Sequence, residues 1–191
     1  MSRIKTPPCR ASYPKLFEPE VNDKGKKVYG LVLLVEDTEE GRAFLKEAEA
    51  LADEAGRGRF RNYDELKKSS GFKKAIRYDV DKYKDVTNPH PIIAFINSRS
   101  YDTPPGVVSI YAGPDHKPMK ITDPQIVYPG AYVRASLHAY AYDQDKSKGV
   151  ALGLGNVQVM QNMAGERIDS RVAAEDEFEA DPKAAANLDD L

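Results

Sequence analysis

The chain contains few of the residues that cross-link a protein or anchor it in a membrane. Among its 191 residues there is no tryptophan and only one cysteine, Cys9, which excludes an internal disulfide and fits a reducing compartment such as the cytoplasm. The longest apolar run covers eight residues, 28–35, whereas a membrane-spanning helix needs about 20. The N-terminal residues MSRIKTPPCR lack the apolar core of a secretory signal. We therefore expect a cytoplasmic protein with one folded domain.

Sequence motifs of catalysis, nucleotide binding and metal binding are also missing. The three histidines are at least 22 residues apart and have no cysteine or glutamate at ligand spacing, so a zinc site is not expected. There is no phosphate-binding glycine loop and no Gly-x-Ser-x-Gly elbow. Two aspartate pairs, Asp79 with Asp81 and Asp143 with Asp145, resemble magnesium-holding pairs of nucleases, although aspartates at turns usually form local hydrogen bonds. The sequence favours a binding protein without metal or cofactor over an enzyme.

Charge is distributed unevenly along the chain. The net charge is −2, but residues 173–191 hold seven acids and one lysine, which leaves +4 on residues 1–172. We expect a folded domain over 1–172 and an acidic flexible tail over 173–191. Such a tail can mimic a phosphate backbone on the basic body or recruit other proteins, or it can simply aid solubility. The tail residues predicted to make these contacts are Glu175, Asp176, Glu177, Phe178, Asp189, Asp190 and Leu191.

The most regular stretch is 128–142, YPGAYVRASLHAYAY, which alternates with period two after a Tyr-Pro-Gly turn. This alternation predicts a strand with a core-facing side of Ala, Val and Leu. The opposite side carries rings and cations in place of the Thr, Lys and Glu of an ordinary solvated face. Its residues are Tyr132, Arg134, Ser136, His138, Tyr140 and Tyr142. Bases can stack on such a surface and phosphates can pair with it. The alternative is that another part of the chain covers these tyrosines.

A second stretch, residues 57–84, is basic and aromatic at once. It holds ten basic residues against four acids, with five interleaved aromatic rings. Basic residues alone would indicate a solvated face, and rings alone would indicate core, but the mixture fits a contact with nucleic acid. We treat 57–84 as an insertion into the domain. The insertion residues predicted to contact nucleic acid are Phe72, Lys73, Lys74, Arg77 and Tyr78.

The remaining periodicity predicts a mainly β protein, a small Greek-key barrel with one inserted amphipathic helix. Gly153 and Gly155 inside the last strand indicate a bulge or bend, as found where a sheet curls into a barrel. Residues 99–106 are predicted to form a loop. The other predicted strands are a short edge strand at 10–19, buried strands at 27–35 and 91–97, and strands at 107–111 and 150–161.

One amphipathic helix is predicted between the early strands. Asp37 or Thr38 can cap its N-terminus, and Gly56 is the expected C-terminal stop. The apolar residues that recur at helical intervals are Phe44, Ala48, Leu51, Ala52 and Ala55.

Several segments, in this order, resemble a family of phage single-stranded DNA-binding proteins. They are RASYPKLFEP at 10–19, FIN at 95–97 with PPGVV at 104–108, YPGAYVRAS at 128–136, GLGNVQ at 153–158 and AEDEF at 174–178. The resemblance implies one OB-fold barrel with an acidic C-terminal tail that binds single-stranded DNA in phage replication, recombination or repair, without catalysis, in the host cytoplasm. Two features depart from the family pattern: Gly155 replaces a larger polar residue before Asn156, and the basic insertion is long.

These observations predict a groove that binds single-stranded DNA. It combines Tyr132, Arg134, His138, Tyr140 and Tyr142 with Phe72, Lys73, Lys74, Arg77 and Tyr78, and has Arg99 and Tyr101 at its rim. The expected partners are single-stranded DNA, further copies of the chain on that DNA, and replication or recombination proteins through the tail. Two alternatives remain: a structural or protein-interaction β-barrel of a virion, and a metal-dependent nuclease that uses Asp79 and Asp81.

Overall fold

The computed structural model describes residues 3–144 and 147–169. The predicted acidic tail and its boundary at residue 172 lie outside the described residues. The strands are β1 (Arg3–Lys5), β2 (Cys9–Val21), β3 (Lys27–Glu36), β4 (Phe72–Lys73), β5 (Ile92–Tyr101), β6 (Val107–Ala112), β7 (Pro118–Lys120), β8 (Tyr132–Gln144) and β9 (Ser147–Val159). The helices are α1 (Glu39–Arg59), α2 (Tyr63–Leu66) and the short 3₁₀ turns η1 (Asp81–Tyr83) and η2 (Pro124–Ile126).

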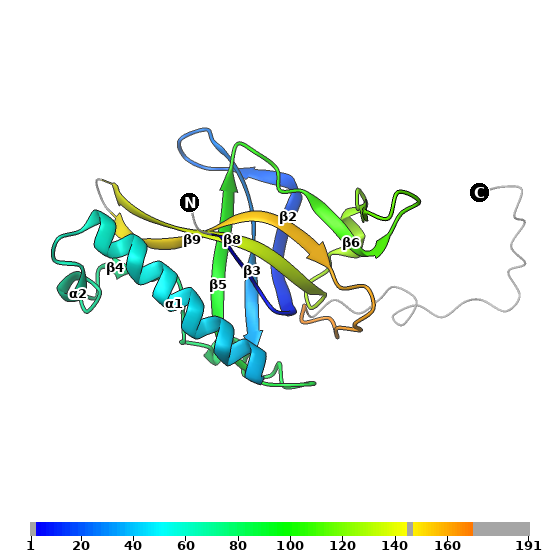
Figure 1. The fold of residues 1–191 in the computed structure, drawn as a ribbon, viewed down its shortest axis with the longest axis horizontal. Coiled ribbons are helices and arrows are strands. Elements are labelled where there is room, and N and C mark those ends of the chain that lie inside the picture. The colour runs from blue at the N-terminus through cyan, green and yellow to red at the C-terminus, as the bar shows by residue number, and fades with distance from the viewer. Residues whose placement is uncertain (1–2, 145–146, 170–191) are drawn as a thin grey trace, which may run out of the picture.

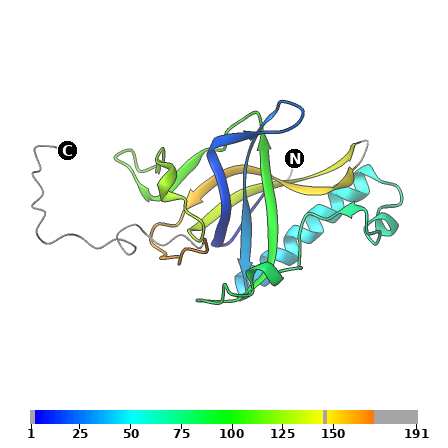
Figure 2. The ribbon, with the colours of Figure 1, turned by 180° about the vertical axis from the view of Figure 1, so that it is seen from behind.

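The strands form one curled, open sheet of the OB type. Its order is β5-β3-β2-β8-β9-β6-β7, with β1 paired to β8 and β4 paired to β9. The long β8–β9 ribbon crosses the layer formed by β2, β3 and β5, and β9 contacts β5 across the fold (Figure 1). α1 packs beside the ribbon, on the side away from β6 (Figure 2). The predicted mainly β, OB-like architecture with one main helix is confirmed.

β3 is buried on both faces, which explains its uninterrupted apolar sequence. Leu31, Leu33 and Val35 contribute to the main core together with α1, β5, β8 and β9. The alternate residues Val32 and Leu34 contribute to a second cluster with Tyr83, Ile92 and Phe95. Side chains that alternate along a strand can therefore serve two cores at once.

α1 begins as predicted and ends later than predicted. Thr38 is the N-cap, and its hydroxyl accepts a hydrogen bond from the backbone N–H of Gly41 at 3.0 Å. Gly56 does not end the helix, which continues to Arg59. Gly56 instead allows a close contact, because a Cβ placed there would lie 2.1 Å from the ring of Tyr63. The glycine is required by packing, so the prediction that it stops the helix was wrong.

One strand and one loop predicted from the sequence also need correction. The segment 10–19 is not an edge strand: β2 extends from Cys9 to Val21 and pairs with both β3 and β8. Its Pro14 and Pro19 fall within register shifts of the β2–β3 pairing, where no ladder hydrogen bond is lost. The predicted loop at 99–106 begins later, because β5 includes Arg99 and Tyr101.

The bulge predicted from the glycines of the last strand is confirmed. The β8–β9 register shifts between Ala135 and Leu137, opposite Gly155. An extra residue in one strand bends the pair and increases its twist. The ribbon can therefore cross over the other sheet layer.

A matched pair of glycine substitutions in α1 tests the helix packing. Gly56→Ala should lower the free energy of unfolding by about 1–3 kcal/mol, because the new methyl group must displace Tyr63. Gly58→Ala, two residues along the same helix, meets nothing within 4 Å and should raise stability by up to about 1 kcal/mol through helix propensity. Urea denaturation of both variants measures the difference. Equal effects of the same sign would contradict the close contact.

Candidate nucleic-acid interface

A groove of about 960 Å³ lies between β5 and the β8–β9 ribbon. Alternate residues of β5 and of β8 point into it, because both strands present every second side chain to the same side. Lys73 at the end of β4 and residues 74, 75 and 77 after it form one wall. Its ring-bearing and cationic lining consists of Lys73, Lys74, Arg77, Phe95, Arg99, Tyr101, His138, Tyr140 and Tyr142.

Three rings of β8 form a ladder along the groove. The His138 and Tyr140 rings stack with centroids 5.8 Å apart, and the Tyr140 and Tyr142 rings are 6.2 Å apart with a 47° tilt. Gly153 faces His138 across the β8–β9 pair, and a Cβ there would lie 2.5 Å from the His138 ring. The glycine therefore lets the His138 ring lie close to β9, and all three rings are half-buried.

His138 and Tyr140 are uncharged at neutral pH. Burial, with a smaller effect from the charge of Arg3, lowers the pKa of His138 below its ordinary value of 6.5. Burial also raises the pKa of Tyr140, helped by the neighbouring Tyr101 and Tyr142. These rings can offer flat stacking surfaces, but they do not supply the positive charge of the groove.

Positive charge comes from the walls of the groove. Lys73, Lys74 and Arg99 are exposed there. Arg77 binds Asp79 through two hydrogen bonds of 2.9 and 2.6 Å, and its guanidinium lies 5.7 Å from the centroid of Phe95. Because exposed ion pairs are weak, a phosphate can compete with Asp79 for Arg77. The rings of β8 thus form the floor of the groove, and the cations that can pair with phosphates form its walls.

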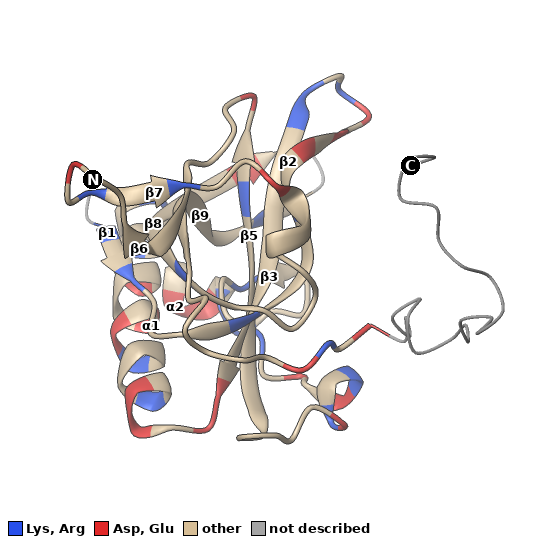
Figure 3. Cartoon of the chain, turned by 90° about the vertical axis from the view of Figure 1, so that its right-hand side faces the viewer, with Lys and Arg blue, Asp and Glu red and all other residues tan. Residues whose placement is uncertain are grey.

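The outer face of α1 shows a different pattern. Acidic and basic side chains alternate along it (Figure 3), starting with Glu39 and Glu40 in the first turn and ending with Arg57 and Arg59 in the last. Acids in the first turn and bases in the last turn interact favourably with the helix dipole. A face of mixed sign is typical of a solvated surface, whereas the described residues that line the groove include Lys and Arg but no Asp or Glu.

Tyr132 and Arg134 do not line this groove, contrary to the prediction. Tyr132 is only 3% exposed, and its hydroxyl donates a hydrogen bond to Glu36 Oε1 at 2.8 Å. Burial and this bond raise the pKa of Tyr132 to about 12. Arg134 is half-buried and donates from Nε to the backbone oxygen of Thr6 at 3.1 Å. The prediction that Tyr132 and Arg134 line the groove together with His138, Tyr140 and Tyr142 is therefore wrong for these two residues, and the alternative of a covered ring applies to Tyr132.

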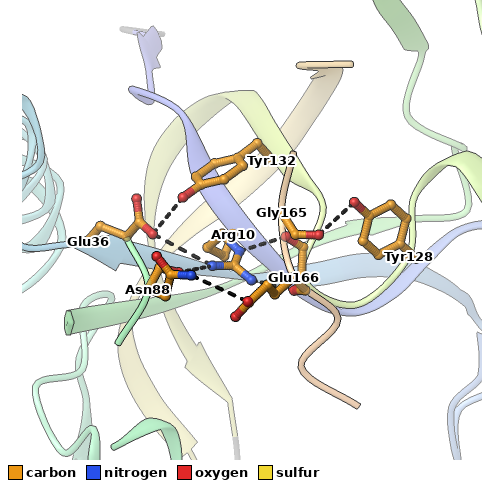
Figure 4. Close-up of polar contacts among 8 residues, drawn as sticks. Arg10, Glu36, Asn88, Tyr128, Tyr132, Gly165 and Glu166 are labelled. Carbon is orange, nitrogen blue, oxygen red and sulfur yellow. Dashed lines mark hydrogen bonds and ion pairs between the residues drawn. The ribbon is translucent and has the colours of Figure 1, made fainter. Parts of the chain in front are cut away.

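The cover over Tyr132 is a polar cluster centred on Arg10 (Figure 4). The Arg10 guanidinium lies 5.1 Å from the centroid of the Tyr132 ring. It donates to the backbone oxygens of Gly130 and Asn88, at 2.6 and 2.9 Å, and to that of Glu166. Segment 160–169 is thereby held over the start of β8, which explains why alternation alone mispredicted the exposure of Tyr132.

Two of the five predicted insertion residues also lie elsewhere. Phe72 is 6% exposed and packs edge-on against Phe60 and Tyr63, with centroid distances of 5.8 Å. Tyr78 is exposed, but it donates to Glu49 Oε1 at 2.6 Å and is not among the lining residues of the groove. Lys73, Lys74 and Arg77 do reach the groove. The aromatic residues Phe60, Tyr63 and Phe72 form a small core, and these cations point outward.

Phe95 and Asn97 also line the groove from β5, although neither was among the predicted groove residues. Both belong to a stretch that was interpreted as a buried strand and as one of the family motifs, but not as part of the groove. Continuing the period of two from Phe95 through Asn97 and Arg99 to Tyr101 would have identified this face.

The nuclease pair Asp79 and Asp81 finds no metal-binding context in the described part of the chain. The hydrogen bonds from Arg77 lower the pKa of Asp79. Within residues 3–144 and 147–169, no group of three or more His, Cys, Asp or Glu side chains is arranged to hold a metal ion. In the same residues, no helix is long and apolar enough to cross a membrane.

A curled, open OB-like sheet with a groove of rings and cations has the features of OB folds that bind single-stranded nucleic acid. The chain belongs to the family described as Enterobacter phage Enc34, ssDNA-binding protein, whose model matches residues 2–190. The family resemblance expected from the sequence motifs is therefore confirmed. No curated protein matches the chain.

Solved structures share this fold at low sequence identity. The single-stranded DNA-binding protein from bacteriophage Enc34 in complex with ssDNA superposes with a TM-score of 0.66 at 18% identity, covering 85% of this chain and 88% of that chain. A second structure of the Enc34 protein gives 0.66 at 18% identity, covering 93% and 90%. The single-stranded DNA-binding protein gp2.5 of bacteriophage T7 gives 0.60 at 13% identity, covering 95% and 99%.

The lowered pKa of His138 predicts a pH effect on stability. Below pH 6.5 the unfolded chain takes up the proton more readily than the folded chain does. The free energy of unfolding should therefore fall as the pH drops from 6.5 through the lowered pKa. Above pH 6.5, His138 is neutral in both states and causes no such loss of stability. NMR titration of the His138 ring should show a midpoint below 6.5, and His138→Gln should reduce the acid-side loss of stability. A midpoint above 6.5 would contradict the burial of this ring.

Proposed function

We propose that the chain coats single-stranded DNA without strong sequence preference and supports phage DNA replication, recombination or repair in the host cytoplasm. The observation that carries the proposal is the ladder of His138, Tyr140 and Tyr142 between cationic walls. Membership of an ssDNA-binding family supports the same conclusion.

Base stacking explains how such a groove binds many sequences. Every base has a π-face, so a ring accepts any of them, and each stacked base contributes about 1–3 kcal/mol. The neutral His138 ring acts in the same way as the two tyrosines. Because the spacing of the rings is 5.8 and 6.2 Å, successive bases must unstack from one another to use the ladder. Single strands permit this, whereas a duplex hides its base faces.

Phosphate pairing supplies the second part of the affinity. Lys73, Lys74, Arg77 and Arg99 flank the rings, where a backbone would pass. Each phosphate contact releases counterions, so the affinity should fall with salt at a log–log slope of about −0.7 per contact. Several copies can follow one another along a long strand.

Two substitutions in the groove separate these contributions. Tyr140→Ala should weaken binding to oligo-dT by about 1–3 kcal/mol and leave the salt slope unchanged, whereas Arg99→Ala should reduce the slope by about 0.7. Tyr111→Ala and Arg42→Ala are matched controls, because both side chains are exposed and lie outside the groove. Fluorescence anisotropy at several salt concentrations measures both quantities. No binding at low salt, or binding indifferent to salt, would overturn the proposal.

The same experiments separate the proposed function from its alternatives. A virion subunit that uses the tyrosine face as an interface should form a stable oligomer and show no affinity for DNA. A nuclease should shorten the oligonucleotide when magnesium is added. We propose binding without catalysis, which the engagement of Asp79 by Arg77 supports, and expect the DNA to stay intact.

The acidic residues 173–191 are proposed to regulate binding or to recruit replication and recombination proteins. Seven acids against one lysine complement the +4 charge of the preceding residues. Deleting the residues after Phe178 should tighten binding at low salt, because fewer carboxylates then compete with phosphates. A truncated chain titrated beside the full chain, at low and high salt, measures the effect. Equal affinities at low salt would restrict these residues to recruitment or solubility.

A further inference from the structure

The groove continues onto a surface that the sequence motifs did not identify. A second hollow, of about 440 Å³, shares Asn97 and Arg99 with the groove and passes over β3. A third, of about 870 Å³, shares Tyr13, Lys15 and Lys82 with the second. The three hollows form one continuous path from β8 over β5 and β3 to β2. We refer to its far end, formed by Tyr13, Lys15, Lys82, Tyr128 and Arg167, as the Tyr13 surface.

Tyr13 is held in an unusual backbone conformation. Its φ is +47°, in the left-handed region, and it precedes Pro14 within the register shift of β2. A bulky residue in this region costs about 1–3 kcal/mol and persists only where the surrounding structure imposes it. Ser12 before the shift and Leu16 after it are each only 3% exposed, so the strand is packed into the core on both sides of the shift.

The strained conformation places the ring in solvent. Tyr13 is 70% exposed, although a tyrosine ring is a large apolar surface that normally packs at least partly. The ring therefore contributes little to the core while its backbone carries strain. Such outliers cluster at binding sites, because only a ligand makes use of the geometry.

Cations accompany this ring along the path. The Lys82 ammonium lies 4.4 Å from the centroid of Phe95, a groove residue, and 4.9 Å from that of Tyr83. Lys15 pairs with Glu20 at 3.4 Å, and Arg167 pairs with Asp169 at 2.9 Å while lying over the Tyr128 ring. The Lys15–Glu20 pair is solvent-exposed and therefore weak, and Arg167 is exposed while Asp169 is half-buried. A phosphate can therefore replace Glu20 beside Lys15 or join Asp169 on the exposed side of Arg167. With Arg99, the cations along this part of the path outnumber its acids by only one, which makes the ring the main recognition element.

We propose that single-stranded DNA leaving the groove at Asn97 and Arg99 crosses β3 and β2, and that one of its bases stacks on Tyr13. This inference rests on the proposed function and extends it, because it predicts a longer binding site than the groove provides. The occupant is the same strand, since the path is continuous with the groove and repeats its combination of a ring with flanking cations.

Two oligonucleotide lengths test the proposal. Oligo-dT of about 5 nucleotides should be bound by the groove alone, whereas about 15 nucleotides, near the upper size of one OB-fold site, should also reach the Tyr13 surface. Tyr13→Asn removes the ring, and asparagine tolerates positive φ, so the fold is preserved. We expect roughly 5- to 150-fold weaker binding of the long probe and unchanged binding of the short one. Tyr13→Phe should restore the affinity for the long probe.

Fluorescence anisotropy gives the affinity of each variant for each probe, relative to that of the original chain. Tyr111→Asn is the control, because Tyr111 is 49% exposed and lines none of the three hollows. Unchanged binding of both probes by Tyr13→Asn, or an equal loss with both, would overturn the proposal. Tighter binding of the long probe would also overturn it and assign the surface to another occupant. If the original chain fails to bind the short probe, the proposed function itself is wrong.

Discussion

The buried side chain of Arg10 is the interaction on which the arrangement of this fold depends. At 1% exposure, a guanidinium must have its donors satisfied, because an unpaired buried cation is strongly destabilising. Arg10 meets this requirement with partners from four segments: Gly130 before β8, Asn88 before β5, Glu166 after β9, and Glu36 at the end of β3, whose carboxylate lies 3.8 Å away. Tyr132 completes the cluster. One side chain of β2 thus holds the start of β8 and segment 160–169 together.

This constraint divides β8 into two parts with different tasks. The first part carries Tyr132 beneath segment 160–169, where it serves the fold. The second part extends beyond that cover and carries His138, Tyr140 and Tyr142 along the groove. Hydrogen bonds at the covered end and the pairing with β9 hold the backbone of the ring ladder in place. A preformed surface of this kind reduces the conformational entropy lost when a ligand binds.

Irregularities in the strands shape the rest of the molecule. The shift opposite Gly155 bends the β8–β9 ribbon, and the shift between Ser12 and Lys15 turns Tyr13 outward. Prolines are accommodated inside β2 only because they fall at such shifts. The bulges are therefore features of the curved sheet that also aim particular side chains.

Local sequence patterns predicted the main strands and the long helix, and the ordered motifs predicted the family. Alternation revealed β8, continuous apolar sequence revealed β3, and a cap with helical spacing revealed α1. Eight of the twelve residues predicted for the groove line it. Tyr132, Arg134, Phe72 and Tyr78 do not, because periodicity tells which side of a strand a residue occupies but not what packs against that side. The partners of Arg10 at Gly130 and Glu166 are 120 and 156 residues distant in sequence. Only the tertiary structure brings such groups together, and it alone decided which rings are covered and which remain open to a ligand.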